Sequence, residues 1–478
     1  MLYHTLKKPR GFALALTLFL IVLLATVCFG ALNVTTLDSR TTTEDYKSSR
    51  AFYAARAGIA FAKSELTDSA RVSLTSVHTY PKTYLQLSGG GTAEEAFSLV
   101  ITPASDNLSR VFRIWKVEST GYYDNASRKV VAFIEQESFA KYGYFTDVET
   151  NQSGRVIQFC DQDQLTGSVH TNGYFTIDGH PRFANQMSSA NNGDSRYTAS
   201  TGIYKRTDKR NTADNKDFYH AASNDYTKDR QVALNDSPDF SFAGGQESIP
   251  LPKSTSADII DAATAADTKF QGNYRIVFTE DGKAKYYKQK TSNNNTYYEG
   301  FPTYAGQPDN PEKVVDTKVS PGVTMYVNGN VEISGTVKGR CTLCASKNMY
   351  IVDDVQYEND NNCVLGLLSE QSIIVRTNQN VNQDLYLDAI VMALNGSFTV
   401  ENYDKGSYRG KLHLFGGVIQ NKRGPVATSR SGGGSIVTGY AKDYVYDPKL
   451  ESMPPLNFPN TGKFRLRYFI DRGSLGGV

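Results

Sequence analysis

The stretch KKPRGF at residues 7–12, followed by an apolar run that continues to Leu32, decides how this chain is organised. Basic residues precede the glycine, and the hydrophobic segment begins at once, without a polar spacer. A secretory signal peptide has its cleavage site behind the apolar run. Here the suitable site lies in front of the run, between Gly11 and Phe12, so we expect the apolar segment to stay on the mature protein.

The apolar run Phe12–Leu32 contains no charged residue. As a helix it is about 30 Å long, which matches the hydrocarbon core of a bilayer. Lys7, Lys8 and Arg10 precede it, and such positive charge favours the cytoplasmic side. The pattern predicts a single pass through a membrane with the long C-terminal part exported. An uncleaved signal anchor is the alternative interpretation.

Helical character continues beyond the apolar run. Apolar and small residues recur there at three- and four-residue spacing, which places them in one stripe: Phe52, Ala55, Ile59, Ala62 and Leu66. No proline occurs between Phe12 and Leu66. We therefore predict one long helix whose first half lies in the membrane and whose second half packs on a globular head.

These features resemble the type IV pilin and type II secretion pseudopilin family. The resemblance rests on the Gly11–Phe12 junction, the apolar run and the stretch AFYAARAG at residues 51–58, which is similar to PilX-like minor pilins and K-type pseudopilins. It implies that a prepilin peptidase cleaves after Gly11 and that Phe12 is methylated. Most family members carry a glutamate at the fifth position after the cut, where this chain has Leu16. The resemblance is therefore to the minority without it, which implies a tip position.

The resemblance also implies the partners and the location. The partners are other pilins or pseudopilins, an inner-membrane assembly platform, and the membrane itself through Phe12–Leu32. The location is the bacterial inner membrane and, after assembly, a cell-surface or periplasmic filament. The formal net charge of +2 gives no long-range attraction to nucleic acid, so no nucleic-acid partner is expected. We predict a subunit without catalytic residues, metal or cofactor. The alternatives are a membrane-anchored carbohydrate-active β-helix enzyme and an envelope scaffold protein outside any filament.

Strand patterns dominate the rest of the chain, so the expected fold class is α+β. Residues 97–101, 111–117 and 130–134 predict an antiparallel meander in a pilin-like head, with the single tryptophan, Trp115, in its core. An Asn-Gly motif then recurs at Asn172, Asn328 and Asn395, which favours a tight turn with positive φ before a short strand.

From residue 323 strands recur about every twenty residues, which predicts a right-handed parallel β-solenoid, with a β-sandwich as the alternative. Helix 257–266 and a strand pair about residues 281–282 are expected in an excursion from it. The expected divisions are a leader at 1–11, a helix at 12–70, a head at 71–147, the start of the solenoid at 148–196, a loop-rich insertion at 197–317, and the solenoid with a C-terminal cap at 318–478.

Two groups of residues could support a catalytic or metal site: the cysteines and a set of carboxylates. Cys341 and Cys344 lie three apart in a strand-like stretch and so point to opposite faces, which argues against a zinc site that also uses Cys160 and Cys363. Burial or one disulfide among these cysteines is favoured over a zinc or redox site. In the enzyme alternative the candidates for acid/base or calcium roles are Asp353, Asp354, Asp384, Asp388 and Glu401. His170 and His413 are expected to be packed or hydrogen-bonded.

Overall fold

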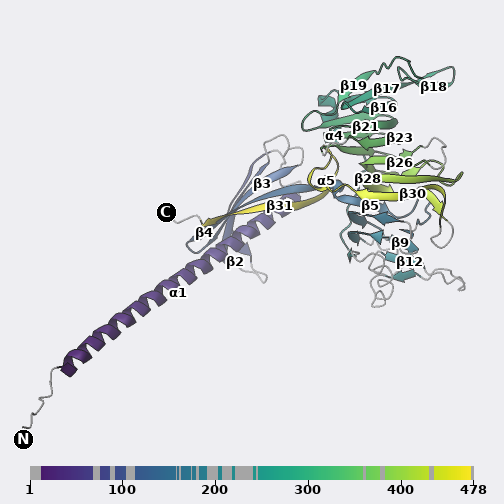
Figure 1. The fold of residues 1–478 in the computed structure, drawn as a ribbon. Helices are drawn as coiled ribbons and strands as arrows, with labels where there is room; N and C mark the ends of the chain where they lie inside the picture. Colours follow the sequence, from purple (N-terminus) through teal and green to yellow (C-terminus); the bar gives the residue numbers. More distant parts are fainter. Residues whose placement is uncertain are drawn as a thin grey trace, which may run out of the picture. The chain divides into compact units, whose positions relative to one another are not determined.

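The computed structural model describes residues 12–67, 76–86, 92–103, 113–157, 159–160, 163–173, 175–178, 182–190, 203–206, 218–220, 241–243, 246–358, 362–376, 383–429 and 435–474. A long N-terminal helix is followed by a chain that is mostly β, as expected for the α+β class (Figure 1). The chain divides into two compact units. We call residues 1–105, 113–135 and 464–478 the head, and residues 106–112 and 136–463 the body.

The head combines one long helix with an antiparallel sheet. Its elements are α1 (Phe12–Thr67), β1 (His78–Gln86), β2 (Thr92–Pro103), β3 (Ile114–Tyr123), β4 (Ala126–Ser138) and β31 (Asn460–Ser474). The strand order in the sheet is β1-β2-β3-β4-β31, and the first three pairs are antiparallel. The β3–β4 turn includes Asp124 at φ 52°, in the left-handed region that aspartate adopts more readily than most residues.

The head core forms between the second half of α1 and one face of the sheet. Strand residues alternate inward along β2 and β3, and the helix presents the stripe predicted from the sequence. The buried members are Ala55, Ile59, Ala62, Leu66, Phe97, Leu99, Ile101, Trp115, Val117, Val130, Ala132, Ile134 and Phe464. Trp115 is 3% exposed, which confirms its expected place in this core.

The last strand lies in the head sheet, although we expected it to cap the body. β31 lies beside β4, and Phe464 packs into the head core. The physical reason is that the β2–β3–β4 meander leaves the far edge of β4 open, and residues 460–474 supply the missing strand. The body is therefore inserted, along the chain, between two neighbouring strands of the head sheet.

The body is built almost entirely from strands (Figure 1). Its first part contains η1 (Phe139–Lys141), β5 (Tyr142–Val148), β6 (Phe159–Cys160), β7 (Gln164–Leu165), β8 (Ser168–Thr171), β9 (Phe175–Asp178), β10 (Arg182–Phe183), β11 (Gln186–Ser189), β12 (Ile203–Arg206), β13 (Phe218–His220) and β14 (Ser241–Ala243). Its second part contains α4 (Ala257–Ala265), β15 (Lys269–Gln271), β16 (Tyr274–Thr279), β17 (Lys283–Ser292), β18 (Asn295–Tyr298), β19 (Lys313–Asp316), β20 (Val323–Asn328), β21 (Val331–Val337), β22 (Arg340–Ala345), β23 (Met349–Tyr357), β24 (Val364–Ser369), β25 (Ile373–Val375), β26 (Leu385–Ala393), β27 (Phe398–Val400), β28 (Tyr408–Lys422), β29 (Ala427–Ser429), β30 (Ile436–Tyr446) and α5 (Lys449–Ser452).

Parallel ladders organise the body. One of them runs without interruption through β15, β20, β22, β24, β26, β28, β5, β8, β11 and β14. Its register stacks one buried row from strand to strand: Met325, Leu343, Leu367, Val391, Val418, Tyr144, Val169 and Met187. A β-sandwich is made of antiparallel strands, so these ladders differ from that alternative.

Residues 269–279 join the parallel ladders, within the stretch 197–317 where we expected a loop-rich insertion. β15 pairs in parallel with β20, and β16 pairs in parallel with β21. Helix α4 and the antiparallel β16–β17 pair occur where the sequence predicts them. The sequence did not indicate that β15 and β16 join the ladders, because no Asn-Gly pair occurs between residues 269 and 316.

The Asn-Gly turns form by a different mechanism from the one expected. Gly173, Gly329 and Gly396 are not at positive φ. At two of the turns glycine is needed because an earlier turn of the chain lies close by. A Cβ on Gly329 would lie 2.1 Å from the Gly272 carbonyl oxygen, and a Cβ on Gly396 would lie 2.2 Å from Ser372 Oγ.

Candidate functional site

The first half of α1 is an exposed apolar surface. Every large hydrophobic side chain described from Leu14 to Leu37 is more than half exposed. No charged residue occurs between Phe12 and Leu37. In the part of the chain that the structure describes, α1 is the one helix long and apolar enough to cross a membrane, by its length and composition.

Threonine hydroxyls in this half bond to the helix itself. Thr17 Oγ1 donates to the Leu14 carbonyl oxygen at 2.9 Å, and Thr26 Oγ1 donates to that of Leu23 at 2.7 Å. In a bilayer core no water is present to satisfy polar groups, so each needs an internal partner. These hydroxyls therefore add little to the cost of placing the segment in lipid.

The residues expected at the processing site lie at the start of this helix. Phe12 is the first residue of α1 as described, and Leu16 is 53% exposed on its apolar half. Gly11 and the leader charges Lys7, Lys8 and Arg10 lie outside the described residues, so their roles stay predictions.

The second half of α1 lies unusually close to the head sheet. Ala51, Ala54 and Ala55 are fully buried. A Cβ on Gly121 of β3 would lie 2.0 Å from the Ala51 carbonyl oxygen and 2.3 Å from the Ala55 nitrogen. On the helix side, a Cβ on Gly58 would lie 2.2 Å from Ser119 Oγ. The alanine-rich stretch noted in the sequence thus docks the helix onto the sheet.

Arginine–carboxylate pairs fix the edge of the head sheet. Glu135 on β4 pairs with Arg465, and Arg467 donates to Glu135 Oε2 at 2.9 Å. Arg128 donates to Asp471 Oδ2 at 2.6 Å. Both sets join β4 to β31. In each ion pair at least one of the two side chains is more than a quarter exposed to solvent. Each pair therefore contributes about 1 kcal/mol or less to the free energy of unfolding.

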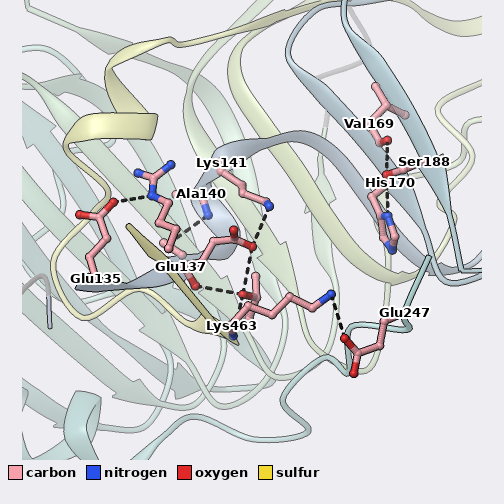
Figure 2. A network of polar contacts seen from close by, with 12 residues as sticks. Glu135, Glu137, Ala140, Lys141, Val169, His170, Ser188, Glu247 and Lys463 are labelled. Atoms are coloured by element: carbon pink, nitrogen blue, oxygen red, sulfur yellow. Dashed lines mark hydrogen bonds and ion pairs between the residues drawn. The ribbon is translucent and has the colours of Figure 1, made fainter. Parts of the chain in front are cut away.

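His170 is buried in the body and is hydrogen-bonded through both ring nitrogens. Nδ1 lies 2.7 Å from Ser188 Oγ, and Nε2 lies 3.3 Å from Asn172 Oδ1. Figure 2 shows the histidine beside Ser188, near the point where Glu137 and Lys141 pair at 2.7 Å. The packing expected for His170 is confirmed. Burial lowers its pKa to about 4, so it is neutral at pH 7.

This histidine predicts that the body loses stability in acid. The unfolded chain takes up a proton near pH 6.5, whereas the folded chain does so near pH 4, so stability falls as pH drops through that window. Between pH 7.5 and pH 5 we expect a loss of about 2 kcal/mol from this group. Urea denaturation of His170→Asn at both pH values should show that much less pH dependence. His413→Gln is the control, and an unchanged slope in His170→Asn would contradict the assignment.

The carboxylates considered for chemistry bond to the backbone of neighbouring strands. Asp354 accepts from the Tyr386 N–H at 2.9 Å, Asp384 from the Lys411 N–H at 2.7 Å, and Asp388 from the Tyr357 N–H at 2.8 Å. These contacts give the three aspartates a structural role between neighbouring strands.

The remaining candidates also have local partners. Asp353 accepts from the Asp354 N–H at 2.9 Å, and Glu401 lies 3.6 Å from Arg376. His413 lies between Asp443, at 2.7 Å, and Asp384, at 3.2 Å.

Cys341 and Cys344 carry buried, free thiols on opposite faces of β22. Burial raises the pKa of both, which keeps them protonated. The described residues include no group of three His, Cys, Asp or Glu that could hold a metal ion. The side chain of Cys160 lies outside the described residues.

Two features were missed by the sequence reasoning. One is a buried ion pair in the body, in which Arg423 donates to Glu149 Oε2 at 3.0 Å with both side chains at most 3% exposed. The other is the edge of the head sheet formed by β31. The pair joins residues 274 positions apart, so no local pattern could reveal it.

Comparisons with known proteins find a family model and a solved structure that are similar to this chain. A family described as "Domain of unknown function (DUF4900)" matches residues 111–191. No curated protein matches the chain. Among solved structures, the competence-associated pilin ComZ from Thermus thermophilus is similar at 14% identity, with 89% of this chain and 98% of that chain covered and a TM-score of 0.33. A TM-score this low does not establish a shared fold.

Proposed function

We propose that this chain is a non-catalytic, pilin-like subunit of a type IV pilus or type II secretion filament. The observation that carries the proposal is α1. Its first half is exposed and apolar, and its second half is docked by alanines and glycines on an antiparallel sheet. One helix thus joins a membrane-spanning segment to a folded head, which is the arrangement that the resemblance of the N-terminal region implies.

Processing and partners follow from the same proposal. A prepilin peptidase cleaves after Gly11, Phe12 is methylated, and an inner-membrane platform assembles the subunit with other pilins. Before assembly, α1 anchors the chain in the inner membrane by a single pass, with the head and body exported. Leu16 replaces the glutamate of most pilins, so the subunit needs no neighbour above it and acts as a minor, tip-like component with the body available for surface contact.

The body is proposed to be a right-handed parallel β-solenoid. The continuous parallel ladder and the buried row that it stacks support this architecture. Side chains of the turns also bond to the next strand: Asn330 Oδ1 accepts from the Asn348 N–H at 3.1 Å, and Asn348 Oδ1 accepts from the Ser372 N–H at 3.0 Å.

The mature N-terminus tests the proposed function. Mass spectrometry of the protein from its native host should find a chain that begins with N-methylated Phe12. Gly11→Leu should retain residues 1–11, because the peptidase needs a small residue there. The matched control is Gly30→Leu, which removes the glycine behind the apolar run and should leave processing unchanged. A wild-type chain that begins at Met1 or after Gly30 would contradict the proposal and leave the scaffold and enzyme alternatives.

A further inference from the structure

An open cleft lies at one end of the head, where α1 meets the ends of strands β1, β2 and β3. Its volume is about 620 Å³, within the range of about 300–1,000 Å³ that is usual for ligand sites. Four tyrosines from three elements line it: Tyr46 on α1, Tyr84 on β1, and Tyr122 and Tyr123 on β3. The cleft is therefore large enough for a small organic ligand, and its walls are aromatic and polar at once.

Two further side chains that line the cleft carry opposite charges. They are Lys82 on β1 and Glu94 on β2, and both are exposed. Neither forms an ion pair with a residue that the structure describes. The second lysine at the cleft is already paired, since Lys47 Nζ lies 2.8 Å from Asp124 Oδ2. The cleft therefore presents one cation and one anion to a ligand.

The ammonium group of Lys82 is held in place by two of the tyrosine rings. Its Nζ lies 4.8 Å from the ring centroid of Tyr122 and 5.4 Å from that of Tyr84. Cation–π attraction of this kind positions the charge over the rings. An ammonium group has three N–H donors, so those directed away from the rings stay available to an anionic oxygen. Lys82 is thus a positioned binding group for an anion such as a phosphate.

The position of the cleft along α1 indicates where its ligand comes from. Leu37 ends the exposed apolar half of the helix, and Thr43, which borders the cleft, lies about 9 Å further along the axis. The head-group layer extends about 5–8 Å beyond the hydrocarbon core on each side of a bilayer. Tyrosine is also enriched at membrane–water interfaces. Given the membrane anchoring proposed above, the cleft borders the lipid head groups on the exported side.

The two unneutralised charges select among head groups. A head group with both a phosphodiester and an ammonium group complements Lys82 and Glu94, whereas a purely anionic head group is repelled by Glu94. A primary ammonium group can donate hydrogen bonds to the Glu94 carboxylate and to phenol oxygens. A quaternary ammonium group instead needs aromatic faces, and those of Tyr84 and Tyr122 already hold Lys82. The cleft therefore favours a head group with a primary ammonium group.

We propose that this cleft binds the head group of a zwitterionic phospholipid with a primary ammonium group, as in phosphatidylethanolamine. Lys82 binds the phosphodiester, Glu94 accepts hydrogen bonds from the ammonium group, and the tyrosines enclose the head group. The proposal rests on the membrane anchoring of α1 and adds to it. The helix holds the chain in the bilayer, and the lipid in the cleft holds the head against the membrane surface.

Native mass spectrometry of the full chain, purified in detergent, tests this proposal. The protein is mixed with equal amounts of phosphatidylethanolamine, phosphatidylglycerol and phosphatidylcholine that have identical acyl chains. We expect the protein to retain phosphatidylethanolamine over either other lipid by about fivefold or more. Lipids that merely surround α1 have no reason to be sorted by head group. Equal retention of the three lipids, or a preference for phosphatidylglycerol or phosphatidylcholine, would overturn the proposal.

Variants assign the preference to the cleft. Lys82→Gln and Glu94→Gln should each lower the retained phosphatidylethanolamine by about fivefold, whereas Lys82→Arg should keep it. The matched controls are Lys63→Gln on α1 and Glu280→Gln in the body, both exposed and outside the cleft, which should change nothing. If Lys82→Gln and Glu94→Gln bind the lipid as the wild type does, the cleft is not the site.

Two further measurements separate this proposal from folding and from the proposed function. Unchanged fluorescence of Trp115, which lies in the head core, shows that the head of each variant is folded. The mature N-terminus is determined on the wild-type preparation. A chain that begins at Phe12 but shows no lipid preference refutes only the lipid site. A chain that begins at Met1 and retains phosphatidylethanolamine refutes only the pilin assignment.

Discussion

Replacing Arg423 with methionine should lower the free energy of unfolding of the body by about 3–5 kcal/mol. The guanidinium donates to Glu149 Oε2 and to the Ile157 carbonyl oxygen, each at 3.0 Å, and lies 3.6 Å from the Phe159 ring centroid. Methionine keeps the apolar length but leaves Glu149 buried without its cation. Burial already raises the pKa of Glu149, and Arg423 opposes that shift. The loss should therefore shrink in acidic buffer, where Glu149 takes up a proton.

Chemical denaturation followed by far-UV circular dichroism measures this loss. Lys290→Met is the control, because it removes an ion pair with Glu299 in which both side chains are largely exposed, and should cost less than about 0.5 kcal/mol. Adding Glu149→Leu to Arg423→Met should recover most of the stability, since the carboxylate left without its cation is then removed. If the double variant is as unstable as the single one, packing rather than charge explains the effect.

Gly121→Ala should destabilise the head by about 3 kcal/mol. The added methyl group meets the Ala51 carbonyl oxygen and the Ala55 nitrogen, which are backbone atoms and cannot rotate away. The helix has to move off the sheet, so the contacts of Ala55 and Ile59 with the core are weakened as well. This is an overpacking effect in a close helix–sheet contact.

The single tryptophan makes this prediction specific to the head. Trp115 is buried in the head core, so its fluorescence reports the unfolding of that unit. The midpoint of its denaturation curve should fall in Gly121→Ala and stay unchanged in Arg423→Met. Gly173→Ala is the control, because its nearest neighbour is 3.6 Å away. An unshifted Trp115 transition in Gly121→Ala would mean that the helix and sheet are farther apart than described.

Local sequence patterns predicted the helices and strands whose formation depends on interactions between residues close in the sequence. The stripe containing Ala55, Ile59 and Leu66 gives the packed half of α1, because helical periodicity determines one face. The strands near residues 331, 373 and 398 follow from short β-branched and aromatic runs. The spacing of Cys341 and Cys344 correctly predicts that they face different cores, since successive strand residues alternate.

Contacts between distant parts of the chain could not be predicted in this way. Arg465 and Glu135 are 330 positions apart, and their pairing joins β31 to β4. Nothing in the periodicity of residues 460–474 says which edge the strand occupies. The unpaired edge of β4 in the predicted meander could have suggested a further strand, because the last strand of a meander either pairs with another strand or is exposed to solvent. The processing residues stay predictions, since Gly11 and the leader charges lie outside the described residues.

The insertion of the body between β4 and β31 has a mechanical consequence. The chain enters and leaves the body at adjacent points, where the Phe139 N–H donates to the Pro459 carbonyl oxygen at 3.0 Å. A pulling force on the body is therefore transmitted to the head through two segments of the chain, β4 and β31, at the same time. A single break in either strand therefore leaves the body tethered to the head by the other.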